Sequence, residues 1–222
     1  LEGGTHNTAA PPYDFLAKTF VPTLKRMGAE VDMKLLTYGF YPAGGGIMKV
    51  TIQAPSRLGR LELTSRGNPG ERTARVLIAN LPRHIAEREL AVVAQRLSWP
   101  AASLKIEPVS SRGPGNVILL KIESENITEV FTGFGERGVR AEAVAENVAQ
   151  EALRYLASNV PVGEHLADQL LLPMALAKGG VFRTLPPSRH MQTNIDTIRQ
   201  FLSTEIRVRL EPERACTVEI AA

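Results

Sequence analysis

The sequence predicts an α/β (α+β) fold in which a helix-and-sheet unit occurs twice, with a small α/β domain inserted between the two occurrences. A helix followed by two strands is expected at both ends of the chain, and the block between them has its own order of elements. Identity between the two units is negligible, so the repeat is one of pattern alone. With 44% hydrophobic and 22% charged residues over 222 positions, the chain can form a globular core.

The first unit begins at the proline pair of residues 11–12, which fixes φ at the start of a helix. Apolar residues then recur at helical spacing as far as Gly28, where we expect the helix to stop. Pro22 should kink this helix, because it removes a backbone donor. Two strands are expected next, at residues 30–38 and 47–54.

The middle block, residues 67–159, begins at a breaker, residues 66–70, that contains two glycines and a proline. Its order is β-α-β-β-β-α, which predicts an inserted α/β domain between two parts of a repeat domain, residues 1–66 and 160–222. The elements expected in the insert are strands at 74–81, 103–109, 116–123 and 128–131 and helices at 86–97 and 139–157.

The second unit follows the segment 161–163. Its pattern predicts a helix, a short strand, a second helix that starts after Ser188, and two final strands. These elements are expected at residues 163–177, 181–185, 189–202, 205–211 and 215–220.

His190 is the candidate for chemistry, because it lies among polar residues in the first turn of this second helix. Free backbone N–H groups and the positive end of the helix dipole favour phosphate at such a position. A histidine near a helix start is also commonly a surface or capping residue, so position alone leaves both interpretations open.

Two further segments carry weaker signals. The glycines at residues 44–46 could place successive N–H groups around an anion, or they could simply form a hairpin turn. Asp168 and Gln169 could bind a metal-bound phosphate or a ribose hydroxyl, or they could be solvated residues of a first helical turn.

Composition excludes some classes of protein. The longest apolar run, residues 170–177, is too short to span a membrane and contains Pro173. Cys216 is the single cysteine, so no intramolecular disulfide can form, which suits a cytoplasmic location. The net charge of +3 predicts nothing about partners by itself.

Several segments of the chain resemble the RNA 3′-terminal phosphate cyclases, in the same order and at similar spacing. The resemblance covers the whole chain. The segments are Gly3-Gly4-Thr5, Ala10-Pro11-Pro12-Tyr13-Asp14-Phe15, Gly39 to Gly46, Ser124-Glu125-Asn126-Ile127-Thr128-Glu129, Leu166-Ala167-Asp168-Gln169-Leu170 and His190-Met191-Gln192-Thr193-Asn194-Ile195.

The resemblance implies a repeat domain related to the enolpyruvyl transferases, with a smaller inserted α/β domain. It also implies an activity, the conversion of an RNA 3′-phosphate to a 2′,3′-cyclic phosphate that consumes ATP and requires a divalent metal, Mg²⁺ or Mn²⁺. A histidine of the family forms a covalent histidine-AMP, and the motif match places His190 in that role. The match identifies no metal ligand in this chain.

The same resemblance assigns a nucleotide site. The family usually has a tyrosine where this chain has His165, and an imidazole can also stack on adenine. The residues assigned to the nucleotide are Pro12, Phe15, His165, Leu166, Ala167, Asp168 and Gln169.

Members of the family carry an additional glycine-rich segment before the part that matches Gly3-Gly4-Thr5. We therefore expect this chain to be a C-terminal portion that lacks the N-terminal repeat unit, with impaired adenylylation. The alternative is a non-catalytic, cyclase-like protein of RNA processing or ribosome biogenesis, but such relatives lose the histidine that His190 matches. An enolpyruvyl-type transferase shares the repeat architecture only.

Overall fold

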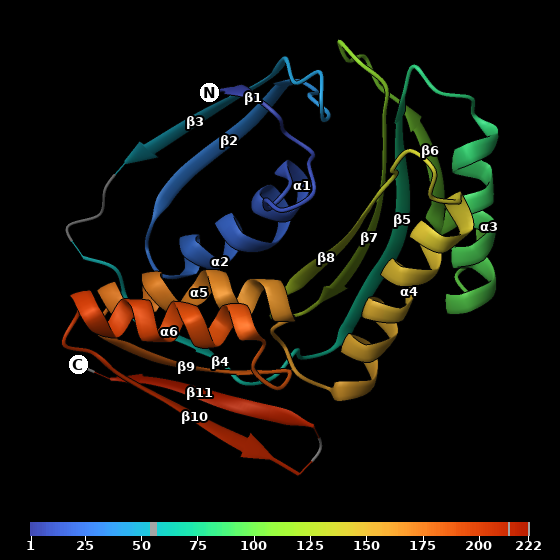
Figure 1. Cartoon of the computed structure of the whole chain (residues 1–222). Helices are drawn as coiled ribbons and strands as arrows, with labels where there is room; N and C mark the ends of the chain where they lie inside the picture. The colour runs from blue at the N-terminus through green and yellow to red at the C-terminus, as the bar shows by residue number, and fades with distance from the viewer. Residues whose placement is uncertain (54–56, 213, 222) are drawn as a thin grey trace.

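The computed structural model describes residues 1–53, 57–212 and 214–221. Within these residues the chain forms one three-stranded sheet and two four-stranded sheets, with helices packed against them (Figure 1). This mixture of helices and sheets confirms the predicted α/β class.

The first unit contains the predicted helix and two strands, preceded by a short strand. Its elements are β1 (Glu2–Gly3), α1 (Tyr13–Phe15), a π-helical segment (Leu16–Phe20), α2 (Val21–Arg26), β2 (Glu30–Thr37) and β3 (Gly46–Gln53). The π-helical segment ends two residues before Pro22, whose missing N–H cannot continue the α-helical hydrogen bonds. The end of the second predicted strand, residue 54, lies outside the described residues.

The second unit agrees with the predicted order and adds a strand that the sequence pattern did not indicate. Its elements are β4 (Leu61–Leu63), α5 (Glu164–Leu176), β9 (Gly179–Thr184), α6 (Arg189–Phe201), β10 (Glu205–Glu211) and β11 (Ala215–Ala221). The sheet order is β10-β11-β9-β4, and the added strand β4 pairs in parallel with β9.

The repeat extends to the topology of the two sheets. In the first unit, β3 lies between β1 and β2 and is antiparallel to both. In the second unit, β11 lies between β9 and β10 and is again antiparallel to both. The repeated unit is therefore a strand, a helix and two strands, and α6 corresponds to the helix formed by α1 and α2.

The middle block follows the predicted order, with two corrections of boundaries. Its elements are β5 (Pro69–Ala79), α3 (His84–Leu97), a 3₁₀ turn (Ala101–Ser103), β6 (Leu104–Pro108), β7 (Gly115–Ser124), β8 (Thr128–Phe134) and α4 (Ala141–Ser158). The first strand starts inside the expected breaker, because Pro69 pairs with Ser124. The fourth strand continues beyond residue 131, because Phe134 pairs with Val117.

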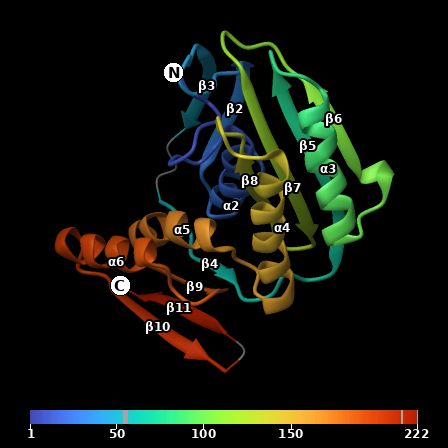
Figure 2. The same cartoon turned by 45° about the vertical axis from the view of Figure 1, so that its right-hand side comes forward.

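The sheet of the middle block, in the order β6-β5-β7-β8, buries both faces. Alternate residues such as Val76 and Ile118 pack with α3 and α4, while their neighbours Leu77 and Val117 pack with Phe40 of the first unit. Figure 2 shows α3 and α4 in front of this sheet and α5 and α6 on the other four-stranded sheet. We propose on this basis that residues 67–159 form the insert and that 1–66 and 160–222 form the repeat domain.

No helix in the described part of the chain is long and apolar enough to cross a membrane.

Candidate functional site

The first turns of α5 and α6 lie beside each other (Figure 1). Asn194 Nδ2, in the second turn of α6, donates to the backbone oxygen and to Oδ1 of Asp168, both at 3.0 Å. Asp168 is the fifth residue of α5, and Asn194 is the sixth of α6. The two helices therefore bring their N-terminal ends to one place, where free N–H groups and both dipoles favour an anion.

His190 occupies the first turn of α6, as predicted, and its side chain is exposed. The predicted cap is present, because Ser188 Oγ accepts a hydrogen bond of 3.2 Å from the N–H of Met191. His190 precedes Asn194 by four residues, so both side chains lie on the same face of the helix. The imidazole is thus one turn away from the contact between Asn194 and Asp168.

The Asp168 carboxylate is half-buried and fixed in orientation. Its Oδ1 accepts from Asn194, and its Oδ2 lies 3.5 Å from Nε2 of the neighbouring Gln169. Gln169 is also half-buried. Asp168 and Gln169, both predicted to bind the nucleotide, therefore lie near the end of α5 that faces the start of α6, where His190 lies.

The other predicted nucleotide residues differ in how much of the side chain a ligand can reach. Phe15, Leu166 and Ala167 are 3%, 0% and 1% exposed and belong to the core beneath α5 and α6. Because the first three N–H groups of a helix have no partner within it, Leu166 can still offer its backbone N–H. Pro12 is buried at the start of α1, whereas His165 is exposed in the first turn of α5.

Glu129 holds the start of α5 and was not predicted as a site residue. It is 2% exposed, and its Oε1 accepts a hydrogen bond of 2.6 Å from the N–H of Gly163, the N-cap of that helix. Burial raises the pKa of the carboxyl to about 8, although the Gly163 N–H and the charge of Arg66 favour the ionised form. The segment Ser124 to Glu129 carries the only signal in the sequence for this role.

The described residues fit a nucleotide better than they fit a metal ion. Two helix N-termini, an exposed imidazole and an oriented carboxylate suit a phosphate chain and a ribose. In the described part of the chain, no group of three or more His, Cys, Asp or Glu side chains is arranged to hold a metal ion.

The glycine turn between β2 and β3 acts as a hairpin. Gly44 and Gly45 adopt φ of +59° and +73°, in the left-handed region that favours glycine, and the strands on either side pair with each other.

Comparison with known proteins identifies relatives along the whole chain. The family model described as RNA 3′-terminal phosphate cyclase matches residues 1–208. An RNA 3′-terminal phosphate cyclase of Ectopseudomonas mendocina is 49% identical over 223 aligned residues, which cover 99% of this chain and 64% of the relative. One from Koribacter versatilis is 47% identical, with 95% of this chain and 60% of the relative covered.

The chain thus spans somewhat more than half of the length of the curated relatives it matches, 64% and 60% for these two. The match nevertheless includes the segments around Asp168 and His190. The chain belongs to the RNA 3′-terminal phosphate cyclase family.

Proposed function

We propose that this chain carries the nucleophile of an enzyme that converts an RNA 3′-phosphate to a 2′,3′-cyclic phosphate at the expense of ATP. The observation that carries the proposal is the exposed His190 in the first turn of α6, beside the first turn of α5 and one turn from the fixed Asp168. A neutral imidazole is a competent nucleophile near pH 7, and helix N-termini stabilise the phosphate that it attacks.

The reaction has three balanced displacements. A ring nitrogen of His190 attacks the α-phosphorus of ATP, and diphosphate leaves with the electrons of the broken P–O bond. An oxygen of the RNA 3′-phosphate then attacks the phosphorus of histidine-AMP, so that the P–N bond breaks and the imidazole is released. Finally the vicinal 2′-OH attacks the RNA phosphorus, AMP leaves, and the hydroxyl proton passes to solvent.

The remaining nucleotide residues have distinct proposed roles. Asp168 and Gln169 bind the ribose or a metal-bound phosphate, and His165 stacks on adenine. Pro12 and Phe15 shape the adenine side of the site. Leu166 contributes through its backbone N–H, because its side chain is buried, whereas Ala167, whose N–H donates to the Gly163 carbonyl, supports the site by packing in the core.

Mg²⁺ or Mn²⁺ belongs to the proposal as the ion that offsets phosphate charge during attack. No residue of this chain is assigned as its ligand. RNA with a 3′-phosphate end is the proposed partner, and a cytoplasmic location is consistent with the buried, free Cys216.

We expect the 222-residue chain, tested alone, to form little or no histidine-AMP. The support for this expectation is the length of the relatives, since this chain spans 64% and 60% of the two described above. The full activity is therefore proposed for a full-length protein that contains this chain.

Adenylylation with radiolabelled ATP tests the proposal. The full-length protein that contains this chain is incubated with α-labelled ATP and Mg²⁺, as the unaltered protein and as His190→Ala and His84→Ala variants. His84 is a matched control, because it is an exposed histidine in the first turn of α3. We expect label in the unaltered protein and in His84→Ala but none in His190→Ala. Equal labelling of the two variants would contradict the role of His190, and RNA binding without label in any form would favour the non-catalytic alternative.

A further inference from the structure

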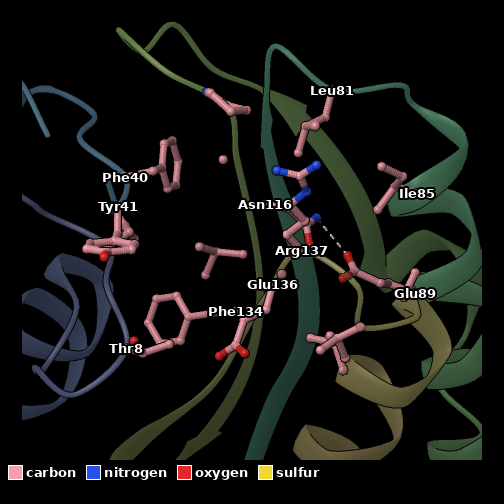
Figure 3. Close-up of a pocket in the computed structure, with 18 of the residues that line it drawn as sticks. Thr8, Phe40, Tyr41, Leu81, Ile85, Glu89, Asn116, Phe134, Glu136 and Arg137 are labelled. Atoms are coloured by element: carbon pink, nitrogen blue, oxygen red, sulfur yellow. Dashed lines mark hydrogen bonds between the residues drawn. The ribbon is translucent and has the colours of Figure 1, made fainter. Parts of the chain in front are cut away.

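A cleft of about 1070 Å³ is lined by residues between His6 and Val144, and none of its described lining residues belongs to α5 or α6. It is formed between the first unit and the insert, and Figure 3 shows its side chains. Its volume is slightly above the range of roughly 300–1,000 Å³ that is usual for small-ligand pockets. The cleft is therefore a second candidate site, separate from His190.

One side of the cleft holds a buried polar pair. Glu89 of α3 and Asn116 of β7 are 0% and 6% exposed, and Asn116 Nδ2 donates to Glu89 Oε2 at 3.0 Å. Within the described residues, Glu89 Oε1 and Asn116 Oδ1 are buried and accept no hydrogen bond. Buried acceptors without partners are costly, so this pair points to a ligand that donates hydrogen bonds.

The opposite side of the cleft is aromatic. Figure 3 shows the rings of Phe40, Tyr41 and Phe134 across the cleft from Glu89. Tyr41 is 81% exposed, which leaves its ring free for contact with a ligand. A Cβ on Gly115 would lie 2.1 Å from the Phe40 ring, so this glycine allows the ring to pack against the wall of the cleft.

Arginines complete the lining. Arg88 and Arg140 pair with Glu142 at 2.5 and 3.5 Å, whereas Arg137 is exposed and forms no ion pair within the described residues. Guanidinium groups bind phosphate well and also stack on bases. The aromatic side, the polar pair and the arginines therefore match the flat ring, the hydrogen-bonding edge and the phosphate of a nucleotide in a single strand.

We propose that the cleft holds an unpaired guanine base of single-stranded RNA. The ring stacks on the aromatic side, and the Watson–Crick edge donates to Glu89 and Asn116. Guanine is chosen because its edge presents two neighbouring donors, N1–H and the 2-amino group. Adenine and cytosine present a donor beside an acceptor, and uracil presents a single donor. The proposal rests on the proposed function in taking RNA as the ligand, and it adds a subsite away from the reacting 3′ end.

Fluorescence anisotropy with labelled hexaribonucleotides tests this subsite in the 222-residue chain. The three probes are hexauridylate, the same strand with one guanosine, and the same strand with one inosine, which lacks the 2-amino group. We expect the guanosine strand to bind roughly 5-fold or more tighter than the inosine strand, because one buried hydrogen bond is lost. Free 5′-GMP serves as a competitor. At a subsite for a strand it should displace the labelled guanosine strand only weakly. Displacement of that strand by GMP at equal concentration would indicate a mononucleotide site and would overturn the RNA assignment.

Two variants with a matched control locate the binding. Tyr41→Ala should weaken binding of the guanosine strand roughly 5- to 100-fold through lost stacking. Glu89→Gln, which keeps the side-chain shape but replaces one acceptor oxygen by an NH2 donor, should weaken binding of the guanosine strand towards that of hexauridylate. Phe201→Ala is the control, since Phe201 is 80% exposed and does not line the cleft. Equal binding of the three strands, or unchanged binding by Tyr41→Ala, would overturn the proposal.

Labelling at His190 in the full-length protein separates this proposal from the proposed function. Adenylylation without guanosine-dependent binding would overturn the cleft assignment alone. Guanosine-dependent binding without adenylylation would overturn the proposed function alone.

Discussion

Replacing Glu129 by glutamine tests whether the carboxyl that holds α5 is buried and mostly protonated at neutral pH. Burial disfavours the charge and raises the pKa of this carboxyl from its ordinary 4.5 to about 8 in the folded chain. A glutamine of the same shape still accepts the hydrogen bond from the N–H of Gly163. The substitution therefore removes the titration and leaves the packing in place.

The sign and size of the effect follow from linkage. A carboxyl whose pKa is raised on folding contributes stability that is fully present below its unfolded pKa and is lost as pH rises through its folded pKa. The wild-type chain should thus lose roughly 1.4 kcal/mol per pH unit between about pH 5 and pH 8, or roughly 4 kcal/mol over that window, relative to Glu129→Gln. Solvent screening does not reduce this figure, since Glu129 is 2% exposed.

Urea unfolding followed by circular dichroism at pH 5, 6, 7 and 8 measures the difference in unfolding free energy between the two proteins. We expect the unfolding free energy of Glu129→Gln to rise relative to that of the wild type at each step of increasing pH. Glu136→Gln is the control, because Glu136 is an exposed carboxyl, and its curve should run parallel to that of the wild type. Parallel curves for Glu129→Gln and the wild type would refute the reasoning.

Three other substitutions test the fold and the site. Burial alone would raise the pKa of Asp14, but the hydrogen bond from His6 and nearby cations lower it to about 2. Roughly 2 kcal/mol of stability that is present above pH 4 should therefore be lost as the pH falls towards 2, and Asp14→Asn should flatten this acid branch in urea unfolding. Ser188→Ala removes a helix cap and should lower the unfolding free energy by roughly 1 kcal/mol, measured by the same method; an unchanged value would argue against the cap. Asn194→Ala releases Asp168 and should reduce the rate of histidine-AMP formation in the full-length protein roughly 10-fold, whereas an unaltered rate would show that this contact does not orient the site.

Local signals in the sequence were sufficient for most elements of the fold. The start of α6 follows from Ser188, whose side chain caps the helix, and β10 has the predicted bounds. The strand β4 was missed because Leu61–Leu63 is too short to show a period, and its partner β9 lies more than a hundred residues later. The end of β8 was missed because Gly133, a weak strand former, interrupts its pattern.

The candidate site was predictable where a motif marked it and unpredictable where distant residues complete it. Local position made His190 and Asp168 candidates, the resemblance assigned their roles, and the structure brings their helices together. Asn194 acts on a residue 26 positions away and Glu129 on one 34 positions away, so neither partnership is visible in local spacing. Leu166 matched the motif equally well, although its side chain lies in the core, because a motif does not distinguish a side-chain role from a backbone role.

The central claim is that His190 becomes covalently bound to AMP. Its most direct test is tandem mass spectrometry of peptides from the full-length protein after incubation with ATP and Mg²⁺, handled above neutral pH to preserve a phosphoramidate. The account predicts an AMP adduct on the peptide that contains His190, on the imidazole and absent when ATP is omitted. An adduct on another residue, with His190 unmodified, would contradict it.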